Sequence, residues 1–279
     1  MDQIKHLSVP DDVRHVLDKR RLRLALIALS ALSLLVCLLT THLLIDFSRP
    51  PSGLPIIPHY GPPTIAQLGF DHIYVIHTHP QRPGQMSRVL QMLQITAEFV
   101  AAPVVPPGNS TLPARRVAEW HAHMGVYRDM RERGFESALI LDGSVDMELN
   151  IKTIMRRVHR VLPSWDLLFP GHCGAFERIQ PRVSAQLPML RVANMPLCLH
   201  AYAVSRSGVD SLLDHLAALP PDRDILGMAI MRLAEQRRLA MYSLDTPVFV
   251  PESTDKTRRL AGNKRLAISA INHLHERQQ

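Results

Sequence analysis

Apolar and polar residues follow two different patterns along most of the chain. Short apolar runs rich in β-branched residues predict strands, and segments with an apolar residue at every third or fourth position predict helices. The predicted strands cover residues 72–76, 97–101, 137–141, 165–169 and 199–204, with one or two more within 239–250. The predicted helices cover residues 85–94, 114–133, 151–162, 207–219 and 224–238. Because strands alternate with helices, we predict an α/β domain with a mostly parallel central sheet that helices cover on both faces.

The longest uncharged segment lies near the N-terminus. Residues 24–45 contain no Asp, Glu, Lys or Arg, and a helix of this length spans roughly 33 Å, enough to cross the hydrocarbon core of a bilayer. A buried core helix is the alternative. Four basic residues lie just before the segment: Lys19, Arg20, Arg21 and Arg23. Since positive charge stays on the cytosolic side, we expect a single-pass type II membrane protein with residues 1–23 as its cytosolic tail.

The rest of the chain divides into three parts. Residues 46–69 are predicted to form a stalk, because residues 47–63 alone contain six prolines and two glycines, and proline-rich segments stay extended. Residues 70–252 contain all the predicted elements of the α/β domain. Residues 253–279 are a basic C-terminal tail, which we expect to form a solvated surface helix.

The chain is basic, with 32 Lys and Arg against 25 Asp and Glu, a formal net charge of +7 and a pI of about 9.7. Such a balance is typical of proteins that bind nucleic acid or anionic membranes. Here the basic residues are spread between the N-terminal flank, the predicted helices and the tail, without a basic stripe interleaved with aromatic residues. We therefore do not expect the protein to bind nucleic acid.

Two features fit an oxidising compartment in which proteins are glycosylated. Asn109 begins an N-glycosylation sequon in a loop rich in proline and glycine. Cys173 and Cys198 both lie in the α/β domain and can form a disulfide. A zinc site that adds His172 and His200 to the two cysteines is the alternative.

A pair of acidic residues follows the third predicted strand. That strand delivers Asp142 to its carboxyl end, and Asp146 comes four residues later. In parallel sheets ligands bind at this end of the strands. Carboxylates gathered there can hold Mg²⁺ or Mn²⁺, which can bridge the phosphates of a nucleotide. Asp-Gly-Ser is also an ordinary turn sequence, so a metal site and a plain turn both stay open.

Four sequence blocks occur in order within the domain. They are residues 73–76 (IYVI), residues 120–142, which begin with WHAHM and end with ALILD, residues 165–174 (WDLLFPGHCG), and residues 196–206 (PLCLHAYAVSR), the last followed by Gly208. Their order and spacing resemble those of the family 25 glycosyltransferases, especially the fungal members. This family includes lipopolysaccharide-biosynthesis and procollagen galactosyltransferase-like enzymes. The resemblance covers residues 71–251.

This resemblance implies a nucleotide-sugar-binding α/β domain of the type called GT-A. It implies transfer of a hexose, often galactose from UDP-galactose, to a glycan or glycoprotein acceptor, with Mn²⁺ or Mg²⁺ at the diphosphate. Together with the predicted topology, it implies a place in the lumen of the Golgi or the endoplasmic reticulum.

The residues and the resemblance together predict a set of site residues. The first acid of the family's motif is kept as Asp142, and Asp146 matches an acid often found just beyond it, so both are expected to hold the metal and to serve catalysis. The expected contacts to substrate are His77 and Arg82, which can reach a phosphate after the first strand, and His123 and Asp224, which lie at or near family positions. Two of these have simpler explanations, since His123 can be a packing residue and Asp224 can favour the dipole at the start of a helix.

The chain departs from the family at the metal motif. The family's strand ends in Leu-Glu-Asp-Asp-Val, whereas here Asp142 is followed by Gly143 and Ser144. Glycine offers no side-chain ligand, and serine offers only a weak neutral one. Two hypotheses therefore stay open: an active glycosyltransferase, and an inactive family member that serves as a membrane-anchored binding or structural protein.

Overall fold

The computed structural model describes residues 65–77, 83–106, 110–173, 177–194, 196, 198–236, 239–252 and 266–276, together with Ser30 and Ser33. The chain divides into two compact units, Met1–Pro50 and Pro51–Gln279, and the α/β domain lies in the second. Within the described ranges no helix is both long and apolar enough to span a bilayer. The predicted transmembrane segment, apart from its two serines, lies outside the described residues, as do most of the stalk, Arg82, Asn109 and residues 253–265.

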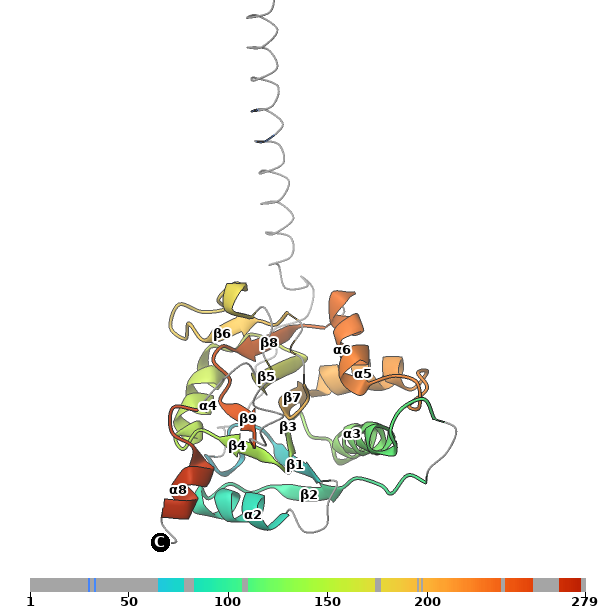
Figure 1. Ribbon diagram of the computed structural model, residues 1–279. Helices are drawn as coiled ribbons and strands as arrows, with labels where there is room; N and C mark the ends of the chain where they lie inside the picture. The colour runs from blue at the N-terminus through green and yellow to red at the C-terminus, as the bar shows by residue number, and fades with distance from the viewer. Residues whose placement is uncertain are drawn as a thin grey trace, which may run out of the picture. The chain divides into compact units, whose positions relative to one another are not determined.

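A seven-stranded mixed sheet forms the centre of the domain, in the order β2-β1-β3-β7-β5-β8-β6 (Figure 1). The strands are β1 (His72–His77), β2 (Glu98–Ala101), β3 (Ser137–Asp142), β5 (Leu167–Gly171), β6 (Leu190–Val192), β7 (Ala201–Ser205) and β8 (Met241–Leu244). β1 is parallel to β2 and β3, and β5 is parallel to β8. β7 is antiparallel to β3 and β5, and β6 is antiparallel to β8. Five strands therefore run in one direction, which confirms the prediction of a mostly parallel sheet.

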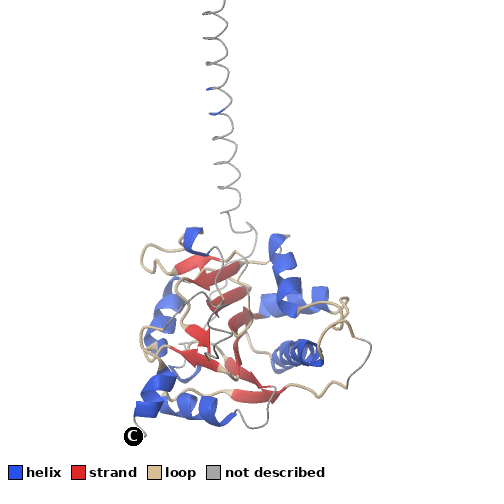
Figure 2. Cartoon of the chain, in the orientation of Figure 1, coloured by secondary structure: helices blue, strands red, loops and turns tan. Residues whose placement is uncertain are grey.

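Helices cover both faces of this sheet (Figure 2). One face packs against α2 (Pro83–Met92), α4 (Ile151–Val161) and α8 (Ala270–Glu276), and the other against α3 (Ala114–Arg133), α5 (Arg206–Leu216) and α6 (Leu226–Glu235). β1 serves both cores, because Ile73 and Val75 lie in the first and Tyr74 and Ile76 in the second. Successive side chains of a strand point to opposite faces, so a strand buried on both sides is apolar throughout.

The sequence predicted the longer elements closely and missed the shortest ones. The helix predicted for residues 114–133 has the same bounds as α3, and it ends at Gly134, whose φ of 73° suits a residue without a side chain. A second, two-stranded sheet pairs β4 (Val145–Met147) with β9 (Phe249–Pro251). Neither β4 nor β6 was predicted, because strands of three residues are too short for an alternating pattern to show. The described residues also include two short 3₁₀ helices, η1 (Ile65–Gln67) and η2 (Glu177–Ile179).

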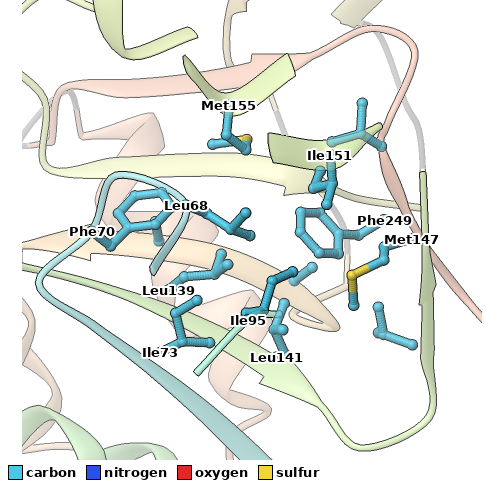
Figure 3. Packing of buried hydrophobic residues seen from close by; sticks show 14 of the residues in the cluster. Leu68, Phe70, Ile73, Ile95, Leu139, Leu141, Met147, Ile151, Met155 and Phe249 are labelled. Atoms are coloured by element: carbon cyan, nitrogen blue, oxygen red, sulfur yellow. The ribbon is translucent and has the colours of Figure 1, made fainter. Parts of the chain in front are cut away.

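The described part of the C-terminal tail belongs to the domain core. α8 buries Ala270, Ile271 and Leu274 in the same core as α4. Figure 3 shows this core, with Ile151 and Met155 of α4 beside the strand residues. The predicted helix is present at Ala270–Glu276, but the prediction that it is solvated is wrong for the face that it buries, since a pattern that short does not reveal a buried face.

Candidate functional site

Three strands meet at the carboxyl edge of the parallel strands. β1 ends at His77 and β3 at Asp142, whereas β7 runs the opposite way and starts just after His200. Two backbone hydrogen bonds join the residues at this edge: Asp142 N–H donates to the carbonyl of His200 at 2.8 Å, and Gly143 N–H donates to that of Ile76 at 2.8 Å. Ligands of open α/β sheets bind outside this edge, which makes it the candidate site.

Asp142 is exposed at this edge, and one of its carboxylate oxygens makes no hydrogen bond. Oδ1 accepts from the backbone N–H of Ser144 at 2.8 Å and from its hydroxyl at 2.5 Å, which is ordinary Asp-turn chemistry. Oδ2 accepts no hydrogen bond from any residue that the structure describes. The turn and the ligand site are therefore compatible, because one oxygen closes the turn while the other is available to a ligand.

Gly143 stands where the family motif has an acid, and local packing gives a reason. A Cβ at this position would lie 3.1 Å from the Cβ of His77 and 3.4 Å from the carbonyl oxygen of Ile76. Protein interiors are close-packed, so a contact this tight must be relieved by movement of a neighbour. The glycine accommodates the histidine at the end of β1, and an aspartate here would require His77 to move.

Asp146 lies on β4, and both of its carboxylate oxygens are engaged. Oδ1 accepts from the backbone N–H groups of Met147 at 2.8 Å and Ile271 at 3.1 Å, and Oδ2 accepts from Ser269 Oγ at 2.6 Å. Ser269 immediately precedes α8. Asp146 thus fastens the C-terminal helix to β4, and its role in metal binding or catalysis stays a prediction that this arrangement does not require.

Replacing Asp146 by alanine is expected to loosen α8 without weakening ligand binding at Asp142. The variant loses three hydrogen bonds and leaves backbone N–H groups unpaired, at a cost of about 1–3 kcal/mol. Hydrogen exchange read by mass spectrometry should show faster exchange in residues 266–276, whereas Asp214→Ala, at an exposed position of α5, should leave it unchanged. Unaltered exchange together with lost nucleotide binding would contradict the role of Asp146 in fastening α8, and would support Asp146 as a residue of the binding site.

Behind the edge, one histidine and two tyrosines form a buried hydrogen-bonded group. His123 Nδ1 pairs with Tyr202 Oη at 2.8 Å, and Tyr202 Oη pairs with Tyr127 Oη at 2.5 Å. Burial lowers the pKa of His123 to about 4, and the charge of Asp142 only partly opposes this. His123 is therefore a neutral packing partner at neutral pH. His121, two residues earlier on α3, is exposed, as the helical spacing predicts.

Two other histidines at the edge each have a buried ring nitrogen without a partner. The Nδ1 atoms of His77 and His200 make no hydrogen bond within the described part of the chain. His200 is 8% exposed, and its Nε2–H donates to the carbonyl oxygen of Phe249 at 3.3 Å. Burial lowers the pKa of His200 to about 4. The ring is therefore neutral, and because Nε2 carries the proton, Nδ1 carries a free lone pair.

A disulfide joins two loops at the same edge. Cys173, just after β5, is bonded to Cys198, just before β7, and their Cα atoms lie 5.6 Å apart. The four-ligand zinc site considered from the sequence is not assembled, because His172 turns away and its Nε2–H donates to the carbonyl of Leu244 at 2.9 Å. The other three residues do come together, with the ligand atoms of Cys173, Cys198 and His200 all within 4.8 Å of one another.

Of the remaining predicted site residues, the structure describes only Asp224. Its carboxylate pairs with Arg232 of α6. The residue that caps α6 is Ile225, whose side chain makes no capping hydrogen bond. Asp224 lies directly before this capping residue, where an acid favours the helix dipole, and it also makes an ion pair with a residue eight positions later. Substrate contacts by Asp224 and Arg82, and glycosylation of Asn109, stay predictions.

Asp142 is the residue at this edge that suits a hard divalent cation. Among the residues that the structure describes, the only group of three or more His, Cys, Asp and Glu side chains close enough to share an ion is the cysteine pair with His200. Asp142 contributes a single carboxylate oxygen without a partner. Mg²⁺ near nucleotides takes one or two carboxylates and fills its other positions with phosphate and water. Asp142 can therefore supply one ligand to an ion that arrives with a diphosphate.

Comparison with known proteins gives no matching family model and no matching curated sequence. Among solved structures, A197 from STIV is similar at 13% identity over 62% of this chain and 81% of that one, with a TM-score of 0.35. A glycosyltransferase involved in glycosylation of the major capsid of PBCV-1 is similar at 9% identity over 73% and 99%, with a TM-score of 0.40. The mannosyltransferase PcManGT from Pyrobaculum calidifontis, in complex with GDP-Man and Mn²⁺, is similar at 14% identity over 82% and 68%, with a TM-score of 0.43. Two of these three proteins are glycosyltransferases, but at TM-scores below 0.5 the likeness carries no functional argument.

Proposed function

We propose that residues 70–252 form a glycosyltransferase domain that transfers a hexose from a nucleotide sugar to a glycan or glycoprotein acceptor. The observation that carries the proposal is the position of Asp142. It ends a parallel strand, lies exposed at the ligand-binding edge of the sheet, and keeps Oδ2 without a partner among the described residues. The four ordered sequence blocks that resemble family 25 support the same activity.

In this proposal the donor's diphosphate lies against the turn that begins at Asp142. Ser144 fixes the carboxylate through Oδ1, so Oδ2 is held in a defined direction. Asp142 would supply one ligand to Mn²⁺ or Mg²⁺, and a bound ion of this kind neutralises a leaving diphosphate. In the transfer step the acceptor hydroxyl attacks the anomeric carbon, the bond to the diphosphate oxygen breaks, and the hydroxyl proton passes to a base.

In this proposal the buried group of His123, Tyr127 and Tyr202 supports the residues at the edge. The hydroxyl of Tyr202 links β7 to α3 through His123 and Tyr127. Because His123 is neutral, it does not compete with a divalent cation for the negative charge of Asp142. We therefore assign His123 to support of the site, rather than to contact with the substrate.

We further propose that the domain lies in the lumen of the Golgi or the endoplasmic reticulum and uses UDP-galactose. The uncharged segment at residues 24–45, with its basic N-terminal flank, supports a type II anchor. The sequon at Asn109 and the disulfide between Cys173 and Cys198 support an oxidising, glycosylating compartment.

A second candidate is an inactive relative that binds a nucleotide sugar or a partner without turnover. The observations that favour it are Gly143, which removes one acid of the family motif to make room for His77, and Asp146, which is engaged with α8. The two candidates differ in turnover, while both predict a ligand at the same edge.

A product-release assay separates the two candidates. The full chain, purified in detergent, is incubated with UDP-galactose or GDP-mannose, with and without Mn²⁺, the sugar passing to the hydroxyl of an added glycan or of water, and the free nucleoside diphosphate is measured. An active enzyme should release it, and Asp142→Asn should reduce the rate about 100-fold, the loss typical when one electrostatic contact to a transition state is removed. Asparagine keeps an acceptor for Ser144, so the turn survives. Asp214→Asn is the matched control and should leave the rate unchanged.

The outcomes of this assay are distinct. Release that depends on Asp142 supports the transferase. No release by a chain that binds the donor in isothermal titration supports the inactive relative. Release that is equal in Asp142→Asn and in the native chain would refute the assignment of the site to this edge.

A further inference from the structure

The cysteine pair and His200 form a cluster that the proposed sugar transfer does not use. The ligand atoms of Cys173, Cys198 and His200 all lie within 4.8 Å of one another. The two cysteines flank the ends of β5 and β7, so the cluster is held by the central sheet. Two thiolates and one imidazole are a donor set that zinc prefers, at bond lengths of about 2.3 Å to sulfur and about 2.0 Å to nitrogen.

His200 is already prepared to act as a metal ligand. Its Nε2–H donates to the carbonyl oxygen of Phe249, while its buried Nδ1 has no partner among the described residues. Metal-binding histidines usually donate their other ring N–H to a carbonyl or a carboxylate, which fixes the tautomer and orients the ring. The side chain is 8% exposed, and its Nδ1 atom is itself buried.

We propose that reduction of the Cys173–Cys198 disulfide creates a zinc site formed by the two cysteine thiolates and His200. A dithiol supplies two electrons and two protons and becomes a disulfide itself, whereas a phosphine supplies two electrons, takes oxygen from water to become a phosphine oxide, and leaves the two protons of that water. Either reductant converts the protein disulfide into two thiols. Each thiol then loses its proton when it binds Zn²⁺. Three protein ligands leave the fourth tetrahedral position to water or to an added ligand. The disulfide and the zinc-bound form therefore exclude each other.

The zinc site is chemically distinct from a cation site at Asp142, although the two are neighbours. Thiolate and imidazole select Zn²⁺, whereas a lone carboxylate beside a diphosphate suits Mg²⁺ or Mn²⁺. The two sites meet at His200, whose carbonyl accepts from the N–H of Asp142 at 2.8 Å.

Zinc binding can be measured directly on the full chain. Cys37→Ser is introduced first, so that Cys173 and Cys198 are the only thiols. The protein is prepared with the disulfide intact or reduced by a phosphine, and Zn²⁺ is titrated in competition with a chromophoric chelator. The reduced form should bind one Zn²⁺ per chain at least about tenfold more tightly than the disulfide form, because only thiolates ligate the ion. Co²⁺ in place of Zn²⁺ should give a thiolate-to-metal charge-transfer absorption in the reduced form.

Two variants test the ligand assignment. His200→Gln should weaken Zn²⁺ binding by the reduced protein at least about tenfold, the loss seen even when outer partners of a metal site are removed. The matched control, His275→Gln, replaces an exposed histidine of α8 and should not change it. Cys198→Ser should abolish the thiolate-to-metal charge-transfer absorption of the Co²⁺ form. If His200→Gln does not fold, this variant tests the proposed metal site instead. Equal affinity of the reduced and disulfide forms, or undiminished affinity in a folded His200→Gln, would overturn the proposal.

Discussion

Lowering the pH from 7 to 5 is expected to remove about 6 kcal/mol of stability from the α/β domain. Burial lowers the pKa values of His123, His159 and His200 from 6.5 to about 4. Between these two values the unfolded chain binds more protons than the folded chain, so stability falls as the pH falls. At pH 5 each histidine contributes a loss of about 2 kcal/mol relative to pH 7, on a scale of about 1.4 kcal/mol per pH unit.

The two tryptophans make this loss measurable. Trp120 and Trp165 both lie buried in the domain, so their fluorescence reports the unfolding of the domain alone in a urea titration at each pH. His159→Gln should remove about a third of the pH dependence, since one of three equal contributions is lost. His121→Gln, at an exposed position, should keep all of it. A free energy of unfolding that is the same at pH 7 and pH 5 would show that these histidines do not stay neutral in the folded chain.

Gly208→Ala is expected to destabilise the domain by about 3 kcal/mol or more, the upper part of the range for overpacking a core. A Cβ at this position would overlap the carbonyl oxygen of Asp166 and lie 2.9 Å from its carbonyl carbon. The backbone of Asp166 cannot easily move, because hydrogen bonds hold both its side chain and its carbonyl group. Its carboxylate accepts from Ser207 Oγ at 2.7 Å and from Ala240 N–H at 2.7 Å, and its carbonyl accepts from Ser205 N–H at 3.0 Å.

The same substitution at Gly125 provides the control. Gly125 lies exposed within α3, and a Cβ there would meet nothing within 4 Å. Gly125→Ala should therefore stabilise the domain by about 0.5–1 kcal/mol, because alanine favours the helix interior. Urea unfolding at pH 7 should show opposite signs for the two variants. A Gly208→Ala domain as stable as the native one would mean that β5 and α5 are not packed as closely as the structure shows.

Much of the fold could be predicted because its longer elements carry their own patterns. β1 and β3 are apolar on both faces, and α3 has a helical spacing that ends at Gly134. The face that α8 buries could not be predicted in this way. It depends on Asp146 and on Glu148, whose carboxylate accepts from backbone N–H groups 119 and 120 residues later. Partners so distant along the chain leave no local signal.

The candidate site could be predicted only in part, for a similar reason. Asp142 was predictable, since an acid at the end of an apolar strand reaches the ligand-binding edge of a parallel sheet. The position of His200 beside Asp142 was not, because it depends on β7 running antiparallel between β3 and β5. The relation between Gly143 and His77 also depends on two strands meeting in space. The bonds of Asp146 to Ser269 and Ile271 could not be predicted either, because sequence distance alone does not show which way a side chain points.

Donor binding at Asp142 is tested most directly by isothermal titration of UDP-galactose into the full chain in the presence of Mn²⁺. We predict binding that weakens at least about tenfold in Asp142→Asn, by about 1.4 kcal/mol or more, and that is unchanged in Asp146→Ala and Asp214→Asn. Heats that are indistinguishable between the native chain and Asp142→Asn, or no binding of any nucleotide sugar by the native chain, would contradict the account.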